Sequence, residues 1–172
     1  LDFIREQFPQ VKRITSYCRS KTAARKSVEE LKRLKEAGLS RIHIGLESGC
    51  DPVLDFIKKG STPADHIQGG RNVVAAGISL SEYVIPGLGG DRWSRPHAVE
   101  TAKVLNAINP DFIRLRTLQV VPGTELYTMR QEGAFRPLPD EEILKEIRLF
   151  IETLEGVTST VVSDPILNLL EE

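Results

Sequence analysis

The sequence predicts an α/β domain built on a parallel β-sheet, and two observations lead to that prediction. Short apolar and β-branched segments alternate along the chain with longer segments whose apolar residues recur at helical spacing. Strands that alternate with helices of this length are typical of right-handed βαβ units. The 172 residues suffice for one domain with a substantial core. Four main strands could form either an open doubly wound sheet or an arc of a barrel.

Strands are expected where β-branched and apolar residues run without a helix breaker. These segments are residues 13–19, 41–48, 79–86 and 112–121, with a possible last strand at 159–163. In the second segment apolar residues alternate from Ile42 to Leu46, which is the two-residue period of a strand. The third ends in a glycine-rich turn, and Pro122 ends the fourth.

Helices are expected between the strands, and some of them carry their own start signals. They cover residues 2–8, 27–38, 51–59, 62–77, 94–108, 124–133 and 140–156. Ser27 and Glu30 have the spacing of a capping box, in which each side chain bonds a free amide of the first helical turn. Gly69 and Gly70 lie inside a helix, where each costs about 1 kcal/mol relative to alanine unless close packing requires it.

Composition and charge exclude several classes of protein. Hydrophobic residues are 40% and charged residues 27% of the chain, as in ordinary globular domains. The formal net charge is −1 without a basic block, so there is no footprint of nucleic-acid or anionic-membrane binding. No apolar run has the length of a membrane span, and there is no signal-peptide pattern. Cys18 and Cys50 suggest neither a disulfide framework nor a metal site, and we expect a cytoplasmic protein.

The carboxyl ends of the predicted strands carry the candidate functional residues, because parallel α/β structures bind their ligands there. These ends hold an arginine, a carboxylate, a glycine-rich turn and an amide, at Arg19, Glu47, Gly87–Gly90 and Gln119. If the apolar residues of the second strand face the helices, Glu47 lies on the opposite face at the end of its strand. His43, Arg114 and Arg116 would share that face, which is therefore not an ordinary apolar core.

Each of these features also has a simpler explanation. Glu47 could pair with Arg19 or Arg116 across the strand ends, and spacing alone does not separate this from a ligand role. His43 is more easily explained as an interior histidine with its hydrogen bonds made than as a metal ligand. The turn GLGG could be only a tight connection, because it matches neither G-x-G-x-x-G nor a phosphate-binding loop.

Three segments taken together resemble the radical S-adenosylmethionine (radical SAM) superfamily, in particular iron–sulfur oxidoreductases with an Elp3/MiaB/NifB-like core. They cover residues 13–62, residues 75–127 and a weaker tail that ends in SDPILN. The run GLESGCDPVLDFIKKG is specific when it precedes a strand that ends in VIPGLGG and a later PGTELY. The tail departs from the pattern, because relatives have S-D-H-x-x-N where this chain has proline at position 165.

The resemblance implies a partial TIM-like (β/α)₆ barrel with its helices on one face only. This chain would supply barrel strands three to six as a single domain, residues 1–172, with residues 137–172 as a C-terminal extension. The family binds SAM and a 4Fe-4S cluster, and holds the cluster with C-x-x-x-C-x-x-C. That motif is absent from this sequence, so we expect Leu1 to lie beyond the cluster loop and the chain as purified to carry no iron.

The resemblance also assigns residues to SAM, whereas it assigns no catalytic residue and no metal ligand to this chain. Polar groups at the strand tips would contact the ribose and methionine parts, and the last two strand ends would meet the adenine. A carboxylate can accept hydrogen bonds from two ribose hydroxyls, and glycine lets the backbone approach a flat base. The matching positions are Ser16, Arg19, Glu47, Ser48, Ile85, Pro86, Gly87, Gln119, Val120 and Val121.

Two functions of different classes follow. The chain could be the SAM-binding portion of a radical SAM enzyme, in which a radical derived from SAM abstracts hydrogen from a substrate that the sequence does not identify. Alternatively, it could be a non-catalytic binding or scaffold domain that keeps the barrel shape. If the first two barrel strands are missing, the edge at residues 14–18 has no partner strand, and we expect self-association there.

Overall fold

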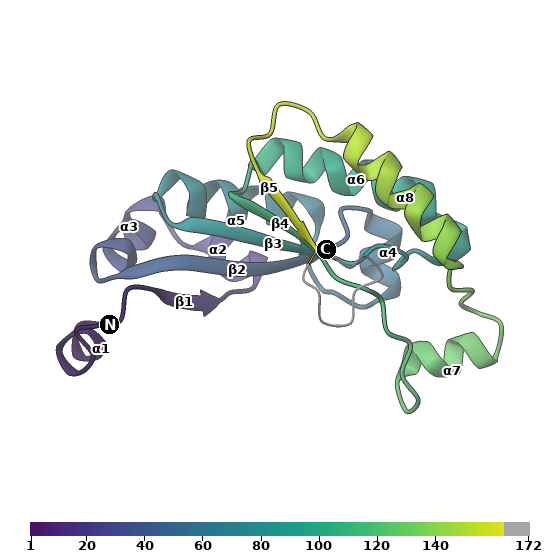
Figure 1. The fold of residues 1–172 in the computed structure, drawn as a ribbon, viewed down its shortest axis with the longest axis horizontal. Coiled ribbons are helices and arrows are strands. Elements are labelled where there is room, and N and C mark those ends of the chain that lie inside the picture. Colours follow the sequence, from purple (N-terminus) through teal and green to yellow (C-terminus); the bar gives the residue numbers. More distant parts are fainter. Residues whose placement is uncertain (164–172) are drawn as a thin grey trace.

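The computed structural model describes residues 1–163 and contains one sheet of five parallel strands (Figure 1). The sheet order is β1-β2-β3-β4-β5, so strands that follow one another in the chain are also neighbours in the sheet. A doubly wound sheet would reverse its order, and that alternative is therefore wrong. The strands are β1 (Ile14–Tyr17), β2 (Leu39–Glu47), β3 (Ser79–Val84), β4 (Phe112–Leu115) and β5 (Thr160–Ser163).

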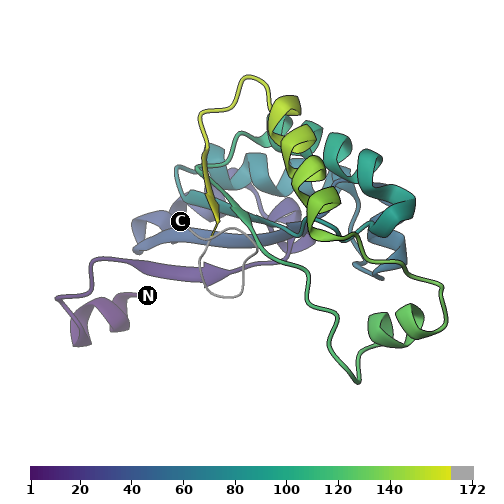
Figure 2. The same cartoon turned by 45° about the vertical axis from the view of Figure 1, so that its right-hand side comes forward.

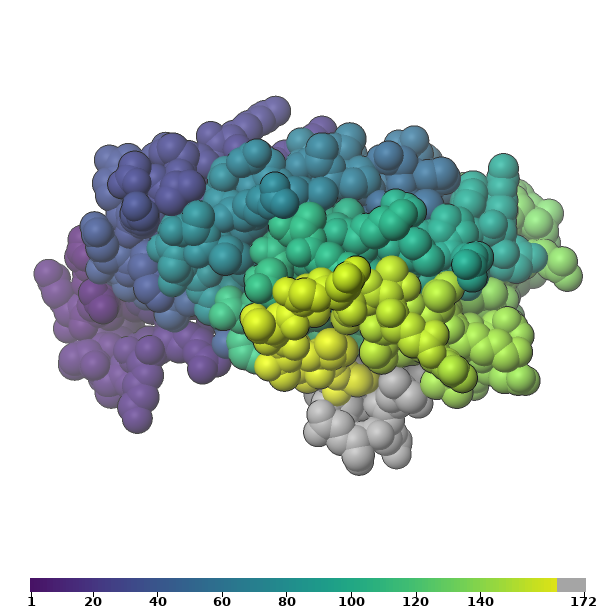
Figure 3. Space-filling model, turned by 90° about the horizontal axis from the view of Figure 1, so that it is seen from above, coloured from purple at the N-terminus to yellow at the C-terminus, as the bar shows by residue number. Residues whose placement is uncertain are grey.

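The main helices cover one face of the sheet, as predicted (Figures 1 and 2). Buried residues of α2, α3, α5, α6 and α8 form one continuous core with one side of the strands. Seen from the helix side, these segments make an unbroken layer from α3 to α8 (Figure 3). The helices are α1 (Asp2–Gln7), α2 (Ser20–Arg25), α3 (Val28–Glu36), α4 (Asp51–Phe56), α5 (Pro63–Ala75), α6 (Gly90–Ile108), α7 (Glu125–Gln131) and α8 (Asp140–Thr153).

Local signals in the sequence explain where helices begin and how closely they pack. Ser27 and Glu30 form the expected capping box at the start of α3. Gly69 of α5 lies against α2, where an added Cβ would stand 2.6 Å from the carbonyl oxygen of Ser20. The added Cβ at Gly70 would overlap the side chain of Ile108. Both glycines therefore offset their low helix propensity by letting α5 approach its neighbours.

The alternation along β2 separates the two faces of the sheet. Ile42, Ile44 and Leu46 are each at most 3% exposed and belong to the core beneath the helices. The residues between them lie on the opposite, concave face, where the ring of His43 stacks on Tyr17 and makes a tilted contact with Tyr83 of the other flanking strand. This confirms the predicted orientation of the strand that carries Glu47.

One of the last two strands differs from the sequence-based prediction, and the other confirms it. β4 ends at Leu115, earlier than the predicted limit of 119–121, and the Arg116 amide extends its pairing by donating to the carbonyl oxygen of Val84. β5 forms the possible last strand and pairs with β4, while α8 packs on α6. Residues 140–163 therefore continue the strand–helix pattern, and residues 164–168 of the tail motif lie outside the described residues.

A buried polar cluster ties the ends of β2 and β3 to α6 and α8. Nε2 of His97 lies 3.1 Å from the carbonyl oxygen of Ile85, which can only accept, so Nε2 carries the proton. Nδ1 therefore accepts from the hydroxyl of Ser48 at 2.8 Å. The amide of Gly87 donates to Oε1 of Glu146 at 2.7 Å. Two helices thus hold the two strand-end segments in place.

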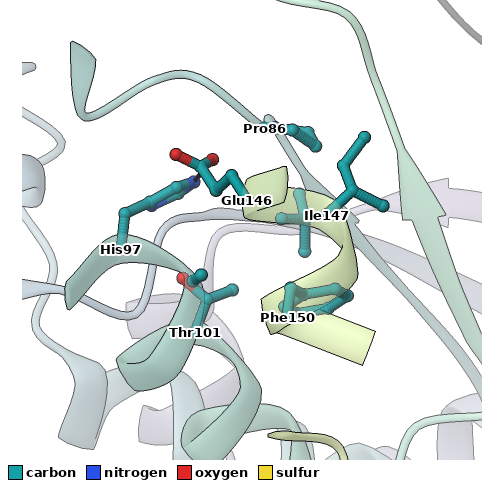
Figure 4. A pocket seen from close by; sticks show the side chains of 8 residues that line it. Pro86, His97, Thr101, Glu146, Ile147 and Phe150 are labelled. Carbon is teal, nitrogen blue, oxygen red and sulfur yellow. Dashed lines mark ion pairs between the residues drawn. The ribbon is translucent and has the colours of Figure 1, made fainter. Parts of the chain in front are cut away.

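A small cavity lies beside this cluster, between α6 and α8. Figure 4 shows the side chains of His97 and Glu146 directed toward one another at its edge, above Thr101 and Phe150. The space open to the centre of a water molecule is about 10 Å³, which is close to the minimum that one water requires. Oε2 of Glu146 is buried with no hydrogen-bond partner among the described residues. Burial raises the pKa of Glu146, although the Gly87 amide opposes that shift.

The neutral state of His97 predicts a pH dependence of folding. Burial lowers the pKa of His97 from 6.5 to about 4 in the folded protein. The unfolded chain therefore binds more protons between these values, and the free energy of unfolding decreases as the pH falls through that window. We expect the wild type to lose on the order of 1–2 kcal/mol more stability than His97→Gln between pH 7 and pH 5.

Chemical denaturation of both proteins at the two pH values measures this difference. Comparing the variants cancels the contribution of His66, whose pKa is also lowered to about 4. Equal pH-dependent losses in the two proteins would contradict a buried neutral His97.

The outer edge of β1 predicts self-association. The amide of Cys18 donates to the carbonyl oxygen of His43, so amides at alternate positions, including Thr15, face away from β2. Among the described residues, β1 pairs with no strand other than β2. We expect light scattering at high concentration to detect dimers, and Thr15→Pro to remove them because proline lacks the outward donor. Thr15→Ser keeps the amide and is the control, and dimers that persist in Thr15→Pro would exclude this edge.

Candidate functional site

A groove of about 880 Å³ opens at the carboxyl ends of β1 and β2 and onto the concave face. One wall is β1 with α2, and the other is the segment that follows α4. The floor includes Gly45 and Tyr83 on the concave face of the sheet. Glu47 and Arg19, two of the residues predicted from the strand ends, both line this groove.

Glu47 has an unusual backbone conformation that directs its side chain back over the strand. Its φ of 60° lies in the left-handed region, and the pairing of β2 with β3 shifts register at this point. The carboxylate lies over Gly45, where an added Cβ would overlap Oε1 of Glu47. Glycine at position 45 therefore provides the space that the carboxylate occupies on the concave face.

The partner of Glu47 is Lys59, which the sequence analysis did not identify. Nζ of Lys59 lies 3.2 Å from Oε1 of Glu47, so among the described residues Glu47 pairs with neither of the predicted alternatives, Arg19 or Arg116. The side chains of Glu47 and Lys59 are 22% and 27% exposed, so water only partly screens the pair. Lys59 follows the short helix α4, which leads the chain away from the end of β2 and back toward it. The sequence predicted this helix, and the helix was the signal that could have placed Lys59 near Glu47.

The backbone of Glu47 is strained. Among the described residues three non-glycine positions have positive φ, and these are Glu47, Lys58 and Asn109. Asn109 is an ordinary left-handed cap at the end of α6, and Lys58 ends α4 in the same way, because the amides of Lys58 and Lys59 donate to the carbonyl oxygens of Asp55 and Leu54. Glu47 is the one of the three whose conformation no helix end explains. Strained residues of this kind occur at functional sites because the surrounding structure holds them for a purpose other than stability. The strain therefore marks the groove as the candidate site.

A second carboxyl group lies beneath the site. Glu82 of β3 is fully buried, and neither of its carboxylate oxygens has a hydrogen-bond partner among the described residues. Burial raises the pKa of Glu82 well above its ordinary value, and the nearby charge of Glu47 raises it further. Glu82 is therefore held in its neutral form, which spares the core an unpaired charge.

A buried histidine connects the two walls of the groove. Nε2 of His66 lies 3.3 Å from the hydroxyl oxygen of Ser20 in α2 and 3.0 Å from that of Ser61. Burial lowers the pKa of His66 to about 4, and the neighbouring charge of Lys59 acts in the same direction. His66 is therefore neutral near pH 7 and fixes the spacing of the walls without adding charge.

The structure places Ser48 and Ser16 away from the groove. The hydroxyl of Ser48 is fully buried, and besides donating to His97 it accepts from the amide of Cys50. It would have to break these bonds to reach a ligand, so its described role is to hold the strand end. Ser16 pairs in register with Ile42 and therefore lies on the helix side of β1.

The other predicted residues also lie outside the groove lining. Pro86 and Gly87 are buried in the turn near α8, and Ile85 packs against a small apolar cluster around Cys50 and Leu88. Three further residues follow the end of β4 in an irregular segment, and these are Gln119, Val120 and Val121. Because β4 ends early, the structure does not bring these three together with Glu47 in the groove.

Two further properties concern metals and membranes. Within residues 1–163, no group of three or more His, Cys, Asp or Glu side chains is placed to hold a metal ion. No helix in the same range is both long enough and apolar enough to span a membrane.

Comparison with known proteins gives consistent matches. The sequence model of the Radical SAM superfamily matches residues 5–102. A tRNA uridine(34) acetyltransferase of Methanocaldococcus jannaschii is 26% identical over 120 residues, which are 69% of this chain and 22% of that protein. A biotin synthase of Nitratidesulfovibrio vulgaris is 35% identical over 125 residues, which are 71% of this chain and 31% of that protein.

Solved structures share the fold. Elp3 of the archaeon Methanocaldococcus infernus matches with a TM-score of 0.70 and 22% identity, covering 92% of this chain and 36% of that one. The chain therefore spans between 22% and 36% of the length of these relatives. Because the family model matches more than half of the chain, and the fold agrees with it, the chain belongs to the radical SAM superfamily.

Proposed function

We propose that this chain is the SAM-binding portion of a radical SAM iron–sulfur enzyme. The observation that carries the proposal is the Glu47–Lys59 pair, held over Gly45 in a strained backbone at the carboxyl end of β2. A strand end of this kind is where parallel α/β enzymes bind their ligands. The groove volume of about 880 Å³ lies within the usual range for small-molecule sites.

The residues in the groove have the chemistry that the nucleoside part of SAM requires. The carboxylate of Glu47 can accept hydrogen bonds from both ribose hydroxyls, and its charge strengthens them. Lys59 restrains one carboxylate oxygen at 3.2 Å, which limits the orientations of Glu47 before a ligand binds. Gly45 leaves the strand surface open beneath the carboxylate. When bound and reductively cleaved, SAM would supply the hydrogen-abstracting chemistry of the enzyme.

The cysteines of this chain do not fit an iron–sulfur cluster. Cys50 is buried and Cys18 is half-buried at the edge strand, and two cysteines cannot provide three thiolates. In this proposal the cluster ligands come from a part of the complete enzyme outside this sequence. The chain itself binds and orients SAM.

Substitution of Glu47 tests the proposal directly. We expect Glu47→Ala to weaken SAM binding by on the order of 1–3 kcal/mol, because the ribose hydroxyls lose their charged acceptor. The measurement is SAM titration of the complete enzyme by calorimetry, with thermal unfolding of the same samples. Unchanged SAM affinity with reduced thermal stability would show that Glu47 is a structural ion-pair residue and would favour the scaffold alternative.

A second substitution at the same position separates binding from folding. Glu47→Gly should lose SAM affinity to the same extent as Glu47→Ala. It should nevertheless be more stable to unfolding than the alanine variant by about 1 kcal/mol, because glycine adopts the left-handed conformation without strain. A glycine variant that is less stable than the alanine variant would contradict the strain at this position.

Gly45 provides an independent test of the space beneath the carboxylate. Its φ is not positive, so Gly45→Ala leaves the backbone unstrained, but the methyl group would displace the carboxylate of Glu47. We expect weaker SAM binding with unfolding stability within about 1 kcal/mol of wild type. The double variant Gly45→Ala/Glu47→Ala should bind SAM as weakly as Glu47→Ala alone, because both changes act on the carboxylate of Glu47. Additive losses of affinity would exclude that coupling.

A further inference from the structure

We propose that the α2 wall of the groove binds a phosphate group of the enzyme's small-molecule substrate. This inference rests on the proposed function, because it assigns a substrate class to the same groove. The binding residues are Arg19, Lys21 and Arg25, all of which line the groove on the side opposite Lys58 and Lys59.

The charges that line the groove do not balance. Five of the lining side chains are cationic, and Glu47 is the one carboxylate among them. Glu47 is paired with Lys59, and Lys58 is paired with Glu125 of α7. Arg19, Lys21 and Arg25 form no ion pair within the described residues. Because the whole chain has a net charge of −1, this excess of positive charge is a local property of the groove.

The three cations share one wall whose position is fixed. Lys21 and Arg25 are one helical turn apart on α2 and therefore lie on the same face of the helix, and Arg19 immediately precedes the helix. Ser20, between them, points inward to His66, which also holds Ser61 on the opposite wall. The spacing of the walls is thus set before a ligand enters, which lowers the entropic cost of binding.

The arrangement favours a phosphate over other anions. Several cations along one wall suit a group with two negative charges better than a single carboxylate, and the planar guanidinium of arginine matches phosphate oxygens in pairs. Three cations in one groove do not form the extended basic stripe that a nucleic-acid strand requires. Tyr17, which is exposed, belongs to the same wall of the groove and offers an apolar ring surface there.

The test measures binding of inorganic pyrophosphate by calorimetry at fixed low ionic strength. The triple variant Arg19→Gln/Lys21→Gln/Arg25→Gln should bind pyrophosphate at least about tenfold more weakly than wild type, because it loses charge-assisted hydrogen bonds. The control is Lys12→Gln/Arg33→Gln/Lys35→Gln, which removes the same charge from exposed residues outside the groove and should retain wild-type affinity. No binding by wild type, or equal losses in both variants, would overturn the proposal.

Two further binding experiments distinguish a substrate phosphate site from the cofactor site and from a nucleic-acid site. SAM should not displace pyrophosphate, and displacement would show that the cations serve the cofactor instead. A single-stranded oligonucleotide that binds more tightly than pyrophosphate and loses affinity in the triple variant would overturn the small-molecule assignment. If wild type binds pyrophosphate through these cations but shows no SAM binding that depends on Glu47, the proposed function fails while the anion site stands.

Discussion

The close attachment of the β2 strand end to α6 is the constraint on which the site depends. Gly49 lies so near α6 that an added Cβ would stand 2.6 Å from the carbonyl oxygen of Glu100, and its amide donates to Oγ1 of Thr101 at 2.8 Å. One residue earlier, Ser48 donates to His97 of the same helix. These contacts turn the chain sharply after Leu46, and the turn leaves Glu47 with its positive φ and its carboxylate over Gly45.

The three neighbouring residues Glu47, Ser48 and Gly49 therefore have different roles. Glu47 faces the groove, Ser48 faces the helix layer, and Gly49 allows that layer to come close. The first residue has a role in ligand binding under the proposed function, whereas the other two hold it in place. The strained backbone of Glu47 needs this support, because a non-glycine residue in the left-handed conformation persists only where its surroundings determine that conformation.

Several features near the groove lower the stability of the fold, and they lie on the helix side of the sheet. Glu82 is buried without a partner among the described residues, and His66 and His97 are buried in their neutral forms. Each would be replaced by an apolar residue in a core that served packing alone. The two histidines have clear structural tasks, since each links elements that form or support the groove walls. The contacts of Glu82 do not explain why a carboxyl group stands there.

The amino-acid sequence by itself determined the elements and the orientation of β2. The alternation from Ile42 to Leu46 and the capping box at Ser27 act between near neighbours in the chain, so they can be recognised without a structure. The same local pattern placed Glu47 on the concave face and Arg19 at the strand ends, and both line the groove. The family resemblance was also contained in these short segments.

Only the tertiary structure decided which residues meet. The pairing of Glu47 with Lys59 depends on the path of α4, and the role of Ser48 depends on His97, which lies on a distant helix. β4 ends at Leu115 although the residues after it have strand-like composition, so Gln119, Val120 and Val121 leave the sheet. Strand composition is a local property, whereas the end of a strand is set by whether its neighbours still offer partners for its hydrogen bonds.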